Sequence, residues 1–197
     1  MLNLLELVPD LNYKDDDNCT PLFYLCENER VTKELVDLLL SRGAKPEYGL
    51  IGICSNYNLD PQLAKYLLSK VSDINFKGKR GRTALNSLAD KADNNALKVA
   101  KMVFDKCKGK VSHDKDDWNS TPIQNACNSS EARIEFIQLL VDNGGNPTDG
   151  LVGSLSSYYL QQALVEKLLK LGANPNGRNK DGESGLHGLF AKVSSSF

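Results

Sequence analysis

The chain has 197 residues, and its 24 basic and 25 acidic residues give a formal net charge of −1 at pH 7. This balance leaves no overall field that would draw the chain to nucleic acid or to an anionic membrane, so any binding is expected to be local. The five cysteines include no Cys-x-x-Cys pair, which argues against a disulfide framework and against a zinc site.

The N-terminal segment 1–12 carries Glu6 and Asp10 but no basic residue, which does not fit a secretory signal. No apolar run in the sequence approaches the roughly 18 residues that a membrane-spanning helix needs. We therefore expect a cytoplasmic protein without a membrane segment, with a nuclear location as the alternative.

The chain contains an internal duplication. Residues 14–91 match residues 115–192 without a gap at a shift of 101 positions, and 27 of the 78 aligned pairs are identical. Thr20 matches Thr121, for example, and Gly43 matches Gly144. A self-match of this length is typical of a stacked repeat array, in which each unit buries its apolar face against its neighbours.

Motifs that start and end helices recur within the duplicated block. Thr-Pro-Leu at 20–22 and Thr-Pro-Ile at 121–123 each predict a helix start, because a Thr hydroxyl caps the first turn and Pro needs no partner there. Weaker copies begin at Thr83 and Ser184. Two positions before each start lies a residue that tolerates a left-handed backbone: Asn18, Gly81, Asn119 and Gly182. Left-handed glycines are expected to end the second helices, at Gly43, Gly144 and Gly172.

These openings resemble the ankyrin repeat, a unit of about 33 residues with a β-turn finger followed by two antiparallel helices. The resemblance implies an all-α fold class: an ankyrin-repeat solenoid of stacked helix-turn-helix units with short β-turn fingers. A single ankyrin-repeat domain over residues 1–197 is expected. It would comprise a partial unit at 1–12, units near 13–46, 47–76, 77–109, 110–147 and 148–176, and a partial unit at 177–197.

Two of the units depart from this pattern. Only six steps separate Ala44 from Leu50 and Gly145 from Leu151, too few for a finger hairpin. We therefore expect units 47–76 and 148–176 to lack fingers, and the row of fingers to be interrupted at both. The glycines of these units, at positions 49, 52, 150 and 153, are expected to permit close backbone approach.

The resemblance further implies a non-catalytic module that binds another protein, of unknown identity, through its concave face and finger tips. The candidate tip residues are Asp16 and Asp17, with Asp15, then Lys79, Arg80 and Arg82, then Asp117 and Trp118, with Asp116, and finally Lys180 and Asp181. Tyr24, Asn28 and Asn128 are candidates on the inner helices. The charge of the tips alternates along the chain from acidic to basic to acidic, which favours a partner with a complementary charge pattern.

Trp118 is the only tryptophan and occupies the tip position that Asp17 holds in the sister unit. It is expected either to anchor a partner, as interface tryptophans often do, or to fold back onto the neighbouring finger. The alternative function is a self-associating scaffold protein, in which the C-terminal half unit, with Leu186, Leu189 and Phe190, is capped by another copy.

No enzyme activity, cofactor or metal is expected. His187 holds the family's structural His position, and His113, in a polar stretch, is expected to be solvated. A third hypothesis pairs Cys107 with His113 as nucleophile and base, although no third orienting residue is evident. The basic residues between 77 and 82 are too few, and lack interleaved aromatic residues, to favour nucleic-acid binding.

Overall fold

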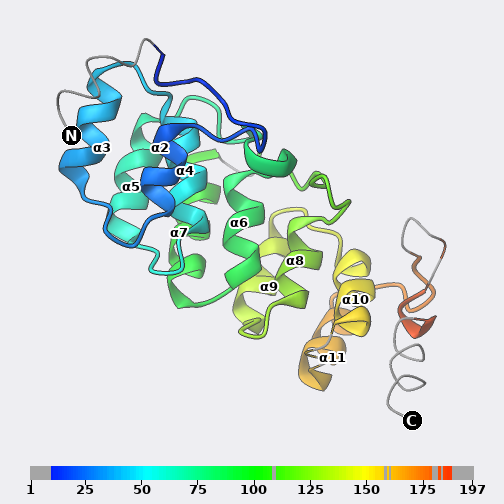
Figure 1. Cartoon of the computed structure of the whole chain (residues 1–197). Coiled ribbons are helices and arrows are strands. Elements are labelled where there is room, and N and C mark those ends of the chain that lie inside the picture. The colour runs from blue at the N-terminus through cyan, green and yellow to red at the C-terminus, as the bar shows by residue number, and fades with distance from the viewer. Residues whose placement is uncertain are drawn as a thin grey trace. The chain divides into compact units, whose positions relative to one another are not determined.

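The computed structural model describes residues 10–107, 110–157, 159, 161–178, 182 and 184–187. Within these residues all regular elements are helical, apart from an isolated antiparallel bridge between Arg178 and Ser184, so the expected all-α class is confirmed (Figure 1). In chain order the elements are α2 (Pro21–Glu27), α3 (Lys33–Ser41), α4 (Pro46–Ser55), α5 (Pro61–Lys70), the short 3-10 helix η1 (Lys79–Gly81), α6 (Ala84–Lys91), α7 (Asn94–Cys107), α8 (Pro122–Asn128), α9 (Ile134–Asp142), α10 (Pro147–Ser156) and α11 (Gln162–Lys170).

The contacts divide the chain into two compact units, Met1–Ala84 and Leu85–Phe197. In the first unit α2 packs against α3 and α4, and α4 packs against α5. In the second unit α8 packs against α9 and α10, α10 packs against α11, and α7 packs against α9. In each unit, therefore, the first helices of two successive helix pairs lie side by side. The single domain expected over 1–197 stays a prediction.

The helix starts form as the sequence predicts. Thr20 Oγ1 accepts a hydrogen bond from the N–H of Phe23, and Thr121 Oγ1 accepts one from the N–H of Gln124. The Gln124 side chain accepts from the N–H of Thr121 in return, which completes a capping box. Four further helices have side-chain caps that were not predicted, at Thr32, Asp60, Asp93 and Asn146.

The helix ends are also confirmed. Gly43, Gly144 and Gly172 have φ values of +90°, +100° and +90°. After α3, the N–H of Gly43 donates to Leu40 O over 3.0 Å and the N–H of Ala44 donates to Leu39 O over 3.1 Å. These two bonds form a Schellman motif, which satisfies carbonyl groups that the helix itself cannot pair.

The predicted close approaches occur where successive first helices pack. A Cβ added at Gly52 of α4 would lie 2.4 Å from the carbonyl oxygen of Phe23 in α2. In the second unit, a Cβ at Gly150 of α10 would lie 3.1 Å from Ile123 Cδ1 in α8, and one at Gly153 would lie 3.2 Å from Gln124 Cα in α8. Glycine therefore sets how closely α4 approaches α2.

Helices α4 and α10 start at Pro46 and Pro147, three residues after the glycines at 43 and 144. These segments contain no finger, as predicted. The missing finger before α4 does not separate the fingers that precede and follow it, however. Asn18 Nδ2 donates to the carbonyl oxygen of Gly78 over 3.3 Å, so the fingers on either side of α4 and α5 touch.

Candidate protein-binding surface

Three fingers in the described residues, 15–19, 78–82 and 116–120, share one backbone pattern. The N–H of the first residue donates to the carbonyl of the fifth over 2.9–3.0 Å, and the N–H of the fourth donates back to the carbonyl of the first over 2.8–3.1 Å. The fourth residues have φ values of +63° at Asn18, +66° at Gly81 and +63° at Asn119. Each finger is thus a tight hairpin closed by a left-handed residue, with its second and third residues at the tip.

Asp15 holds the first finger together from inside. Its Oδ1 accepts hydrogen bonds from the N–H groups of Asp17 and Cys19 over 3.0 and 2.8 Å, and its Oδ2 accepts one from the Tyr24 hydroxyl over 2.5 Å. The Tyr24 hydroxyl, followed by the Cys19 N–H, lowers the pKa of Asp15, and Asp15 in turn raises the pKa of Tyr24. Asp15 is exposed, as expected, but its carboxylate already accepts three hydrogen bonds within the finger, and its contact with a partner stays a prediction.

Asp116 plays the same part in the finger 116–120. Its Oδ1 accepts from the N–H groups of Trp118 and Ser120 over 3.1 and 3.0 Å, and its Oδ2 accepts from Asn125 Nδ2 over 3.2 Å. The Asp116 side chain is buried, so its expected exposure at the tip is wrong. A short carboxylate that accepts from two backbone N–H groups ahead of it is common turn chemistry, and the repeated Asp at 15 and 116 was the signal for it.

The tips of the first unit carry opposite charges. Asp16 and Asp17 are exposed on one finger, and Arg80 is exposed on the other, with a φ of +54°. The Nζ of Lys79 lies 5.4 Å from the ring centroid of Phe23 and 5.9 Å from that of Tyr24. Lys79 is therefore positioned by cation–π contacts as well as by its finger.

Two other predicted residues of the first unit lie away from the tips. Arg82 is half-buried, and its carbonyl closes the base of the finger by accepting from the N–H of Gly78 over 2.9 Å. Its expected tip position is therefore wrong, because it follows the left-handed residue that ends the turn. Asn28 is exposed at the end of α2, where its Oδ1 accepts from the N–H of Arg30 over 2.9 Å.

In the second unit, Asp117 and Trp118 form the tip of the finger 116–120. Asp117 is exposed, and the Trp118 side chain is 52% exposed. Asn128 is exposed at the last position of α8. The predicted residues Lys180 and Asp181, like Leu189 and Phe190 of the C-terminal half unit, lie outside the described residues.

The candidate residues therefore form separate groups. Within the first unit, the contact between Asn18 and Gly78 brings the acidic and basic tips together, and Tyr24 lies between them through its bonds to Asp15 and its contact with Lys79. The sequence offers no signal for this grouping, because Asn18 and Gly78 are 60 positions apart and two complete helix pairs, α2 with α3 and α4 with α5, lie between them.

The two histidines have structural contacts. The Nε2 of His113 lies 2.8 Å from the carbonyl oxygen of Asn143, and its ring stacks on that of Phe104 at a centroid distance of 6.2 Å. The expectation that His113 is solvated is wrong, since it is half-buried against these groups. The Nδ1 of His187 lies 2.9 Å from the Ser184 hydroxyl, within the weak fourth opening motif.

The cysteines are free thiols. Cys19, Cys26, Cys54 and Cys127 are buried, and Cys107 is half-buried at the end of α7. Burial raises the pKa of the Cys107 thiol, which lowers the fraction of reactive thiolate at neutral pH. This shift does not favour the hypothesis of a Cys107 nucleophile.

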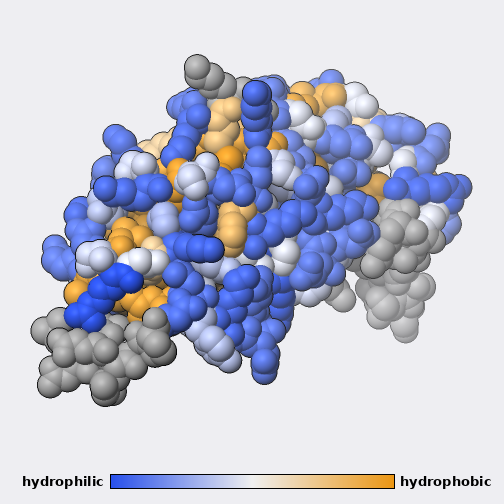
Figure 2. Space-filling view, turned by 90° about the horizontal axis from the view of Figure 1, so that it is seen from above, coloured by the Kyte–Doolittle hydropathy of each residue, from blue (hydrophilic) through white to orange (hydrophobic). Residues whose placement is uncertain are grey.

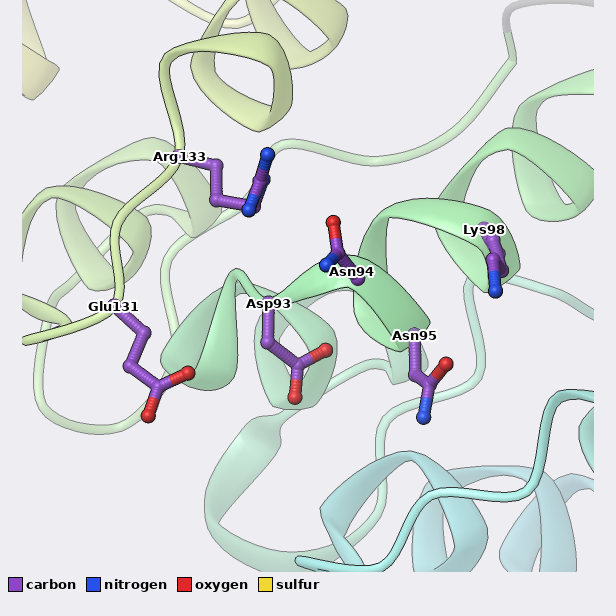
Figure 3. A pocket seen from close by; sticks show the side chains of 6 residues that line it. All are labelled: Asp93, Asn94, Asn95, Lys98, Glu131 and Arg133. Atoms are coloured by element: carbon purple, nitrogen blue, oxygen red, sulfur yellow. The ribbon is translucent and has the colours of Figure 1, made fainter.

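A polar pocket of about 430 Å³ lies in the second unit, between the start of α7 and the segment that leads into α9 (Figure 3). Two carboxylates and two cations line it, so it has no net charge that would select an ion, and Asp93 is occupied in capping α7 through the N–H of Ala96. None of the predicted site residues belongs to it. Its lining residues are Asp93, Asn94, Asn95, Lys98, Glu131 and Arg133.

A second pocket, of about 500 Å³, lies between α3 and α5 in the first unit. Asp37 of α3 accepts hydrogen bonds from Lys33 and from the Tyr66 hydroxyl of α5, and Lys33 Nζ lies 4.2 Å from the Tyr66 ring centroid. These contacts join the two helices. In the described part of the chain, no group of His, Cys, Asp and Glu residues is arranged to hold a metal ion.

The face shown in Figure 2 is largely hydrophilic, with smaller hydrophobic areas between the hydrophilic residues. None of the described helices combines the length and the apolar character needed to cross a membrane. No model of a known protein family matches the chain, and no curated protein sequence matches it.

Proposed function

We propose that the chain is a non-catalytic ankyrin-repeat protein that binds another protein through its finger tips and the adjoining first helices. One observation carries this proposal. All three fingers close their own backbone, and two of them also hold their first residue, an aspartate, by internal hydrogen bonds. The two tip positions of each finger carry charged or aromatic side chains, and all of these except the half-buried Lys79 are exposed. Side chains held on rigid hairpins can contact a partner without a large loss of conformational entropy.

The paired helices and short hairpins support the ankyrin arrangement, as does the regular placement of the left-handed residues. Within this arrangement Trp118 is the strongest candidate for an anchor. Its backbone is fixed by Asp116 while 52% of its side chain remains exposed, and tryptophan is enriched among residues that dominate binding energy.

Affinity purification from the native source tests the proposal. The wild-type chain should capture a protein that Trp118→Ala captures at least tenfold more weakly, with little change in melting temperature. Tyr57→Ala is the matched control, because Tyr57 is an 88% exposed aromatic residue in the loop after α4, and the adjacent Asn56 binds the carbonyl of Asn28 at the end of α2 that is opposite the finger 15–19. Equal loss of the captured protein in both variants, or retention in both, would remove the tips from the proposed surface.

Self-association through the C-terminal half unit remains the second candidate. Its support is Leu186, a large apolar side chain that is 48% exposed near the end of the described residues. Leu186→Lys should then lower the average mass in sedimentation equilibrium and should not change capture of the partner. A wild-type mass equal to that of one chain would rule this candidate out.

A further inference from the structure

The paired fingers of the first unit form a surface that is complementary to itself. The acidic tip of Asp16 and Asp17 and the basic tip of Lys79 and Arg80 are neighbours, because Asn18 Nδ2 binds the Gly78 carbonyl at 3.3 Å. A 180° rotation about an axis between two tips of opposite sign places acid on base twice. A second copy of the chain therefore has the charge pattern that this surface requires.

Tyr24 supplies an apolar centre to the same surface. Its hydroxyl is fixed on Asp15 of the first finger, and its ring lies 5.9 Å from Lys79 Nζ of the other finger. The side chain nevertheless remains 45% exposed. A phenol ring that is held in place and half exposed between two charged tips can be buried against an equivalent ring at low entropic cost.

We propose that the finger pair 15–19 and 78–82 binds the finger pair of a second copy of the chain, with the acidic tip of each copy on the basic tip of the other and the two Tyr24 rings near the two-fold axis. The interface is small and its ion pairs are exposed, so the dimer should be weak, with a dissociation constant between about 10 µM and 1 mM. The dimer does not depend on the proposed protein partner. A partner that uses Asp16, Asp17, Lys79 or Arg80 would compete with it.

Sedimentation equilibrium with two charge-reversal variants tests the dimer. Asp16→Lys/Asp17→Lys makes both tips basic, and Lys79→Glu/Arg80→Glu makes both acidic. The dimer of each variant alone should have a dissociation constant at least tenfold higher than that of the wild type, because both contacts between tips then join like charges. An equal mixture of the two should associate at least tenfold more tightly than either variant alone, because a fully basic surface meets a fully acidic one.

Two controls separate this surface from a general effect of charge. Arg42→Glu/Lys65→Glu reverses two exposed cations elsewhere on the first unit and should leave the dissociation constant within about twofold of the wild type. Raising the salt concentration from about 0.05 M to about 0.5 M should weaken the wild-type dimer severalfold.

The proposal is overturned if the wild type stays monomeric up to about 1 mM, if the control variant dissociates as readily as the tip variants, or if the mixture does not recover association. A monomer would leave the proposed partner binding untouched, since capture through Trp118 is measured separately.

Discussion

Asn18 and Gly78 join two fingers that are 60 residues apart, through a 3.3 Å hydrogen bond from the Asn18 side chain to the Gly78 carbonyl. Asn18 also has a φ of +63°, so one residue both closes its own finger and holds the next one. Gly78 is buried, and a Cβ there would lie 2.8 Å from Ile51 Cδ1 of α4. The contact thus depends on α4, which carries no finger of its own.

Asn18→Ala should lower the free energy of unfolding by about 2 kcal/mol, because it removes the side-chain bond and places a Cβ-bearing residue without polar compensation in the left-handed region. Asn18→Gly is the matched variant. Asn18→Gly removes the same hydrogen bond, but glycine adopts a positive φ without strain, so the free energy of unfolding should fall by only about 1 kcal/mol. Urea unfolding measures both. Equal losses would show that the left-handed backbone imposes no cost at this position.

Gly52→Ala should destabilise the chain by about 3 kcal/mol, because the new methyl group would collide with the Phe23 carbonyl oxygen at 2.4 Å and Cys26 Cβ at 2.9 Å. Its sister position provides the control. At Gly153 the nearest atom is 3.2 Å away, so Gly153→Ala should cost about 1 kcal/mol. A similar loss in both variants, measured by urea unfolding, would contradict the closer approach of α2 and α4.

Glu47 should contribute stability that depends on pH. It is 8% exposed, and its Oε1 accepts from the N–H and hydroxyl of Ser72 over 3.0 and 2.9 Å. Burial by itself raises the pKa of Glu47, but hydrogen bonds from its own N–H and from Ser72 outweigh it and hold the pKa below the ordinary value of 4.5. Because the pKa is depressed in the folded state, this stability is present above pH 4.5 and is lost as pH falls through the folded pKa.

Glu47→Gln should therefore reduce stability at pH 7 by about 1–2 kcal/mol and should flatten the fall in stability below pH 4.5. Ser72→Ala, which removes only the hydroxyl donor, should show a smaller change in the same direction. Unfolding curves collected across this pH range measure both effects. An unchanged slope in Glu47→Gln would assign the acid sensitivity to other carboxylates.

Cys107 should react with iodoacetamide before the other thiols, because it is half-buried and the other four are buried. Its rate per thiol should nevertheless be below that of the urea-unfolded chain at the same pH, since burial raises its pKa. Mass spectrometry after timed alkylation gives both rates. A native rate above the unfolded rate would indicate an activated thiolate and would revive the hypothesis of a Cys107 nucleophile.

The local backbone follows from the sequence where one residue type has one physical use. Thr20 and Thr121 cap helices, and glycine or asparagine takes the left-handed positions that the sequence predicts, because these preferences act over a few residues. The exposure of Asp116 and of His113 was predicted wrongly for a different reason. An exposed position in a motif does not reveal whether a polar side chain turns toward solvent or back onto a backbone amide or carbonyl.

The sequence by itself determined the all-α class and where most of the helices begin and end, because helix caps and left-handed turn residues act over a few neighbouring positions. Only the tertiary structure decided which tips meet. The contact of Asn18 with Gly78 and the placement of Lys79 beside Tyr24 depend on how closely α4 packs on α2, and that approach is set by glycines whose effect appears only when the two helices come together.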